Sequence, residues 1–92
     1  MDATEFAWAQ DASNRLPKNA KPRILIVSHV EGKKVVAHSY CAFQSPRGNW
    51  FAYNPTRGTQ QLLASQVPNA TAWGKELVPT ANGSWFEGNE VK

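Results

Sequence analysis

Three consecutive segments near the middle of the chain are predicted to be β-strands. The first is rich in β-branched residues, and the second alternates between apolar and polar side chains, as a strand with one buried face does. The segments are Arg23–Glu31, Lys34–Gln44 and Trp50–Asn54. Gly32 and residues 45–49, which include Pro and Gly, are typical of the turns between strands. The pattern therefore predicts two successive hairpins, with Gln44 opposite Trp50.

The pattern before these strands has helical spacing. Residues 2–16 are predicted to form a helix, with Asp2 as N-cap and Glu5 at the reciprocal position of a capping box. Pro17 ends the helix. Its inward positions are Phe6, Ala9, Ser13 and Leu16. Together with the strands, this predicts an α+β fold in which an N-terminal helix packs on a small antiparallel sheet.

The pattern after residue 57 is weaker. Residues 59–67 are predicted to form a short helix that Thr59 caps, with Leu62, Leu63 and Val67 turned inward.

The last part of the chain is predicted to contain an irregular segment at 69–75, a short strand at 75–79, a turn at 81–83 and a final edge strand at 84–87. Trp73, Trp85 and Phe86 are either late core residues or an exposed aromatic patch for a partner. We favour the core, because a small domain must bury its large rings.

Composition narrows the class of protein. Ninety-two residues form one domain, and 41% hydrophobic with 18% charged residues is ordinary for a compact fold. The net charge of +3 is spread out, with Lys33 and Lys34 as the one adjacent pair, which argues against nucleic-acid binding. No segment has the roughly 20 apolar residues that cross a bilayer, and the acidic N-terminus is unlike a signal peptide.

The cysteine and histidine content excludes several kinds of site. The chain has one cysteine, Cys41, and two histidines, so neither an internal disulfide nor a structural zinc site is expected, and no cofactor is implied. We interpret Cys41 as a small buried hydrophobe and His29 as a surface histidine. A reducing, cytoplasmic setting fits these features best.

His38 and Asn54 are the residues whose arrangement suits chemistry. The predicted register places Tyr40 opposite Asn54 and His38 opposite Thr56. The side chains of His38 and Asn54 therefore project from one face as diagonal neighbours. Cys41 points to the other face. An imidazole held at one ring nitrogen by a carboxamide can take a proton from a nucleophile at the other. A structural histidine beside a turn asparagine is the alternative.

Residues 38–56 resemble the His-to-Asp segment of transglutaminase-like cysteine proteases, a branch of the papain-like fold. That segment has a strand histidine, a turn with glycine, and a Trp-containing strand that ends in Asp-Pro-Thr. The matching residues here are His38, Gly48, Trp50, Asn54, Pro55 and Thr56. Residues 2–7, DATEFA, resemble the helix start that carries the nucleophilic cysteine in these families, with Ala3 at its position. The resemblance covers residues 2–57 and implies a papain-like core with a cleft where Ala3, His38 and Asn54 converge.

Two departures from the family pattern affect the expected activity. Asn54 replaces the usual Asp, which papain-like relatives tolerate. Ala3 replaces the nucleophile, and a methyl group cannot attack a carbonyl. The resemblance therefore implies a cysteine peptidase or amide hydrolase domain that is inactive as written, either a pseudoenzyme or an inactivated variant. It would bind a peptide or a glutamine-like amide without turnover.

Two alternatives remain open at this point. One is a small non-catalytic interaction domain, of a size that a phage encodes, that binds a host protein through its aromatic C-terminal region. The weaker one is a nucleic-acid binder in which Trp50 and Tyr53 stack on bases and the basic side chains are those of Arg47, Arg57, Lys33 and Lys34.

Overall fold

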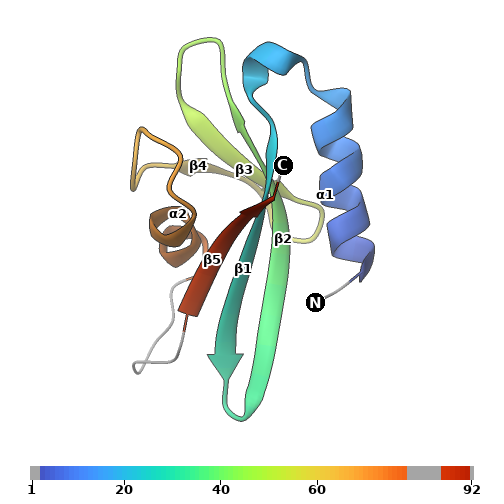
Figure 1. The fold of residues 1–92 in the computed structure, drawn as a ribbon, viewed down its shortest axis with the longest axis vertical. Helices are drawn as coiled ribbons and strands as arrows, with labels where there is room; N and C mark the ends of the chain where they lie inside the picture. The colour runs from blue at the N-terminus through green and yellow to red at the C-terminus, as the bar shows by residue number, and fades with distance from the viewer. Residues whose placement is uncertain (1–2, 79–85, 92) are drawn as a thin grey trace.

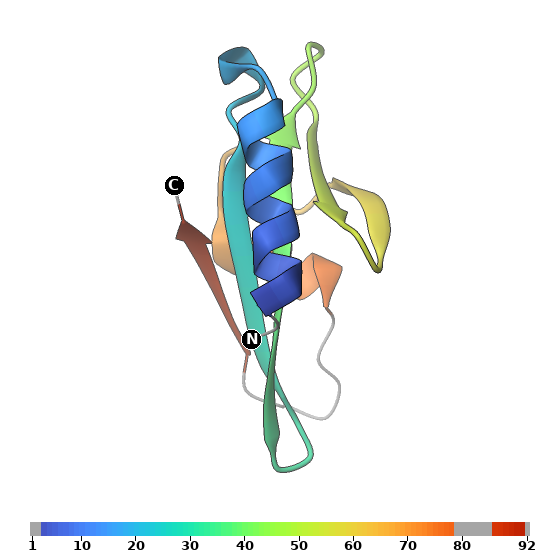
Figure 2. The same ribbon diagram turned by 90° about the vertical axis from the view of Figure 1, so that its right-hand side faces the viewer.

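The protein is a three-layer α+β structure, in which one antiparallel sheet separates two helices (Figures 1 and 2). The computed structural model describes residues 3–78 and 86–91, with side chains over 4–30 and 32–78. The elements are α1 (Ala3–Arg15), the 3₁₀-helix η1 (Lys18–Ala20), β1 (Arg23–Glu31), β2 (Lys34–Gln44), β3 (Trp50–Asn54), β4 (Gly58–Leu62), α2 (Ala70–Leu77) and β5 (Phe86–Val91). The strand order is β4-β3-β2-β1-β5, and every neighbouring pair is antiparallel. The predicted α+β class and the helix-on-sheet packing are confirmed.

Helix α1 packs along β2 on one face of the sheet (Figure 2). Its predicted inward face is confirmed at Ala9, which is fully buried, and at Ser13, whose Oγ lies 3.3 Å from the Sγ of Cys41. Cys41 is fully buried, as predicted. The proposed N-cap Asp2 lies outside the described residues.

The three central strands have the predicted bounds and register. Gln44 pairs with Trp50 in the β2–β3 ladder, and the intervening turn is closed by a 2.8 Å hydrogen bond from the Ser45 N–H to the Asn49 carbonyl. Gly48 has φ of 90° in this turn, a conformation that glycine adopts without a steric cost.

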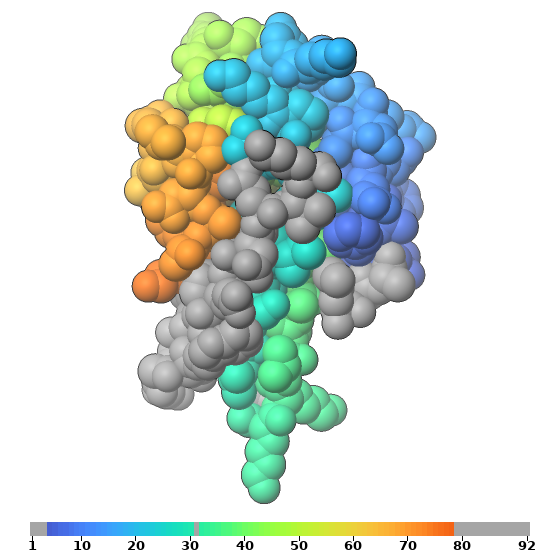
Figure 3. Space-filling model, in the orientation of Figure 1, coloured from blue at the N-terminus to red at the C-terminus, as the bar shows by residue number. Residues whose placement is uncertain are grey.

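The tip of the β1–β2 hairpin projects from the body of the molecule (Figure 3). Lys33 and Lys34 are exposed there, so these charges are solvated.

The hydrophobic core lies between the sheet and α2. Trp50 and Trp73 are its largest rings, with exposed fractions of 2% and 0% and centroids 5.0 Å apart. The core also contains Leu25, Val27, Tyr40, Ala42, Ala52, Leu62, Leu77 and Val78. The assignment of Trp73 to the core is confirmed.

The predicted helix at 59–67 is wrong. The chain turns back after β3 and forms β4, in which Leu62 pairs with Trp50 and is buried. Leu63 and Val67 are 68% and 70% exposed instead of turned inward. Backbone pairing with the open edge of β3 outweighed the weak helical spacing of these apolar residues.

The predictions for 69–75 and 75–79 are also wrong, because this segment is α2. Asn69 caps the helix by accepting a 3.0 Å hydrogen bond from the Ala72 N–H. The helix turns Trp73 and Leu77 to the core at i, i+4 spacing.

The end of the chain is described only in part. The predicted edge strand at 84–87 overlaps β5, which pairs with β1 at one edge of the sheet. The predicted turn at 81–83 and Trp85 lie outside the described residues, as does the side chain of Phe86. None of the helices in the described part of the chain has the length and apolarity needed to cross a bilayer.

Candidate functional site

The candidate site lies where β3 ends and leaves part of β2 without a strand on that side, while β1 remains paired on the other side. At this point the backbone of Ser39 is bonded by two side chains instead of by a strand. Its N–H donates to Oε1 of Glu5 over 2.6 Å, and its carbonyl accepts from Nδ2 of Asn54 over 2.9 Å. Glu5, Ser39 and Asn54 are all buried. Side chains of α1 and β3 thus continue the hydrogen bonding of the sheet where the ladder stops.

Both ring nitrogens of His38 have a charged neighbour. Nδ1 lies 3.4 Å from Oε1 of Glu5, and Nε2 lies 3.2 Å from Nη2 of Arg57. Because a guanidinium can only donate, we assign the lone pair of the neutral imidazole to Nε2 and its proton to Nδ1, facing Glu5. The three side chains form a polar chain from the first turn of α1 to the β3–β4 turn.

The pKa of His38 is lowered from its ordinary value. Burial of the imidazole is the largest cause, and the positive charge of Arg57 adds to it. The carboxylate of Glu5 raises the pKa of His38 in part but does not reverse the shift. His38 is therefore neutral near pH 7, which is the form that can accept a proton.

Asn54 does not form the predicted hydrogen bond with His38. Its Nδ2 donates to Ser39, and its Oδ1 accepts from the N–H groups of Thr56 and Arg57 over 2.8 and 2.9 Å. The amide oxygen bonds the turn because the β3–β4 turn begins at this residue and leaves N–H groups to be capped. Asn54 therefore fixes the turn that presents Arg57, and Glu5 takes the place predicted for Asn54 beside the imidazole.

Ala3 is the first residue of α1, and the start of this helix lies beside His38. Glu5, two residues further along, makes the contact with the imidazole. The side chain of Ala3 is not described. Cys41, the one thiol of the sequence, is buried on the opposite face of β2, and burial raises its pKa. It cannot serve as the nucleophile for His38.

His29 was predicted to be a surface residue, and this is wrong. It is 5% exposed, its ring stacks on His38 with centroids 5.7 Å apart, and its Nε2 has no hydrogen-bond partner among the described residues. The reason is that β5 pairs with β1, so β1 is an internal strand. The β1–β2 register, in which Val27 pairs with His38, already places the two histidines as diagonal neighbours.

Glu5 and Arg57 are the neighbours of His38 that the sequence analysis did not predict. Glu5 was assigned to a capping box, although its helical position one turn before the buried Ala9 indicates that it faces the sheet. Arg57 gives no comparable signal, because its approach to His38 depends on the shape of the turn. Within the described residues, no cluster of three His, Cys, Asp or Glu side chains could hold a metal ion.

No family model, curated protein or solved structure matches this chain. The functional interpretation therefore depends on the geometry around His38 and on the resemblance of residues 2–57.

Proposed function

We propose that the chain is a transglutaminase-like or papain-like domain that lacks its nucleophile at Ala3. It binds a peptide or a glutamine-like amide and does not cleave it. The observation that carries the proposal is the 3.4 Å approach of Glu5 to Nδ1 of His38. A carboxylate at this nitrogen fixes the tautomer and orientation of an imidazole that acts as a general base.

The first turn of α1 supplies the second part of the argument. The families that residues 2–7 resemble carry their cysteine at the start of a helix, where the helix dipole stabilises a thiolate. In this chain the corresponding helix begins at Ala3, and its first turn contacts His38 through Glu5. A cysteine at position 3 would lose its proton to His38, and the thiolate would attack an amide carbonyl. The C–N bond would then break to leave a thioester, with the imidazolium returning the proton to the departing amine.

Arg57 supports a binding role instead of turnover. Its guanidinium lies 3.2 Å from Nε2 of His38, the nitrogen that a nucleophile would need, so a thiol at position 3 would reach this nitrogen only by displacing the exposed Arg57 side chain. Arg57 is exposed, so it can also donate to the carbonyl or carboxamide oxygen of a bound peptide. Such a ligand would lie against Arg57 at the start of α1.

Restoring a thiol tests the proposal. In a Cys41→Ser background, Ala3→Cys is expected to react with iodoacetamide at least about tenfold faster at pH 7 than an ordinary helix-surface thiol, because a thiolate is the nucleophile. Asn14→Cys, at an exposed position of the same helix, provides that reference. Adding His38→Gln to Ala3→Cys should bring the rate down to that of the reference.

A fast reaction that persists with His38→Gln would reflect the helix terminus alone and would refute the proposed ancestry. Equal rates for Ala3→Cys and Asn14→Cys would refute it as well, and would leave a small non-catalytic interaction domain as the better description.

A further inference from the structure

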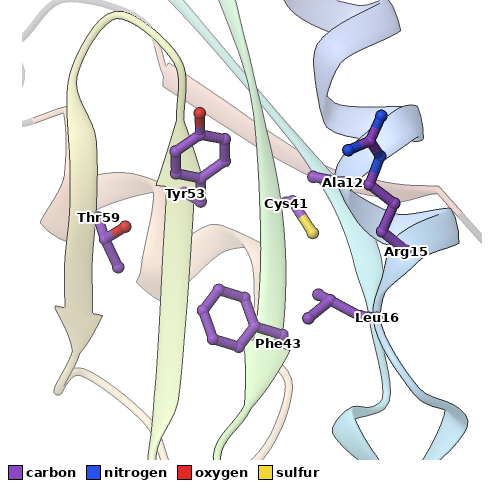
Figure 4. Close-up of a pocket in the computed structure, with 7 residues that line it drawn as sticks. All are labelled: Ala12, Arg15, Leu16, Cys41, Phe43, Tyr53 and Thr59. Atoms are coloured by element: carbon purple, nitrogen blue, oxygen red, sulfur yellow. The ribbon is translucent and has the colours of Figure 1, made fainter.

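A cavity lies between the C-terminal half of α1 and strands β2, β3 and β4, at the other end of the helix from His38 (Figure 4). Its volume is about 280 Å³. Figure 4 shows the thiol of Cys41 on the side of β2 toward the helix and Leu16, and the rings of Phe43 and Tyr53 over the neighbouring strands of the sheet. The lining is mostly apolar, and its polar groups belong to Arg15, Tyr53 and Thr59.

The cavity exists because α1 covers only part of this face of the sheet. The helix packs mainly on β2 and ends at Arg15, so the outer strands β3 and β4 extend beyond it (Figure 2). Phe43 and Phe51 stack on this face with ring centroids 5.8 Å apart, and both remain partly exposed. Partly exposed phenyl rings such as these offer a surface on which the aromatic ring of a ligand can pack.

The guanidinium of Arg15 lies at the edge of the cavity. Nε of Arg15 lies 3.0 Å from Oδ2 of Asp11, one helical turn earlier, and this contact restricts the orientation of the guanidinium. Asp11 is the one ion-pair partner of Arg15 among the described residues, and the Arg15 side chain is 78% exposed, so a ligand in the cavity can reach its guanidinium. A guanidinium presents paired N–H groups that match the two oxygens of a carboxylate.

The volume limits the size of the ligand. Pockets for drug-sized ligands measure about 300–1,000 Å³, whereas a cavity of about 150 Å³ holds a single benzene. A volume of about 280 Å³ therefore accommodates one ring with a short chain.

We propose that this cavity binds a small aromatic monocarboxylate. The ring lies on Phe43 and Leu16 above the thiol of Cys41, and the carboxylate bonds to Arg15. The proposal does not depend on the proposed function, because the ten residues from Glu5 to Arg15 place the two sites about 15 Å apart along the helix.

Binding of 3-phenylpropanoate to the full chain tests this inference. The expected result is a saturable shift of the backbone amide signals of Phe43 and Tyr53 in NMR titrations. The uncharged 3-phenylpropanamide has the same shape and should bind about tenfold more weakly, because it lacks the charge-assisted bond.

Three variants locate the site. Arg15→Gln should reduce the affinity for the acid to the affinity for the amide. Arg47→Gln removes an equal charge from the exposed β2–β3 turn and should change the affinity for neither ligand. Ala12→Leu, which fills the cavity from the helix side, should abolish binding of both.

Equal affinity for acid and amide in the unmodified chain would overturn the proposal. No saturable shift up to about 10 mM ligand, a concentration that reveals even weak affinities, would do the same. Shifts that appear around His38 instead of Phe43 would also refute it. If Ala12→Leu does not fold, two comparisons still test the proposal: the acid against the amide, and Arg15→Gln against Arg47→Gln. Arg15→Gln is expected to fold, because the Arg15 side chain is 78% exposed and contributes little to stability.

Discussion

Two regions of the molecule, the core between the sheet and α2 and the start of α1 beside β2, are stabilised by different kinds of interaction. On the face toward α2, apolar side chains such as Trp50 and Trp73 pack without directional bonds. Where α1 begins, the contact depends on two hydrogen bonds of defined geometry: the N–H of Ser39 donates to Glu5, and the carbonyl of Ser39 accepts from Asn54. The apolar contact provides bulk stability, and the polar contact determines where the start of α1 lies relative to His38.

This contrast has a functional consequence. An apolar interface tolerates small shifts, because its free energy scales with the buried area. A buried polar group that loses its partner costs free energy at once, so the polar contact permits only one arrangement. A site that orients an imidazole requires the second kind of contact.

The largest expected effect tests the apolar face. Trp50→Ala should lower the free energy of unfolding by roughly 3–5 kcal/mol, the usual cost of removing a buried large aromatic ring, as measured by urea denaturation. Trp8→Ala is the matched control, because Trp8 is 51% exposed, and should cost about 0.5 kcal/mol or less. A loss below about 1 kcal/mol for Trp50→Ala would show that the ring does not hold the core.

The next effect tests the polar contact. Asn54→Ala leaves the carbonyl of Ser39 and two turn N–H groups without their bonds, and should lower the free energy of unfolding by about 2–3 kcal/mol. Asn49→Ala, at an exposed turn position, is the control and should have little effect. If both variants unfold at the same urea concentration, Asn54 does not fix the β3–β4 turn.

The smallest effect concerns pH. The pKa of His38 is lowered in the folded protein by burial and by Arg57, so the unfolded chain binds this proton more readily. This contribution to stability is fully present above the unfolded pKa of about 6.5, and it is lost as pH falls through that value toward the folded pKa. The urea concentration at the unfolding midpoint should therefore decrease as the pH is lowered from about 8 to about 5.5. The decrease should be smaller in His38→Gln.

Arg57→Gln sharpens the same measurement. Removal of its charge should raise the pKa of His38 toward the ordinary value, visible in the NMR titration of the imidazole protons, and should weaken the pH dependence. Arg47→Gln is the control of equal charge. An unchanged pKa of His38 in Arg57→Gln would mean that the guanidinium does not act on the ring.

The second half of the fold was predicted less well than the first. The amphipathic pattern of α1 and the composition of β1 to β3 specify each element locally, and a five-residue turn fixes the pairing of Gln44 with Trp50. Residues 58–62 carry a mixed pattern, and the open edge of β3 decides that they form a strand. Asn69 is a residue type that commonly caps helices and could have indicated the helix of residues 70–77. The prediction of an irregular segment at 69–75 did not use this signal.

Part of the candidate site was likewise predictable from local sequence, and part was not. By itself the sequence determined that His38 and Asn54 share a face, because side chains alternate along paired strands whose register a short turn fixes. Only the tertiary structure decided that Glu5 and Arg57 hold the imidazole, that Asn54 caps a turn, and that His29 is buried against His38. These partners come from separate elements, and the choice among them depends on where β3 ends and where α1 begins in space. A one-dimensional pattern carries the period of each element but not the distances between elements.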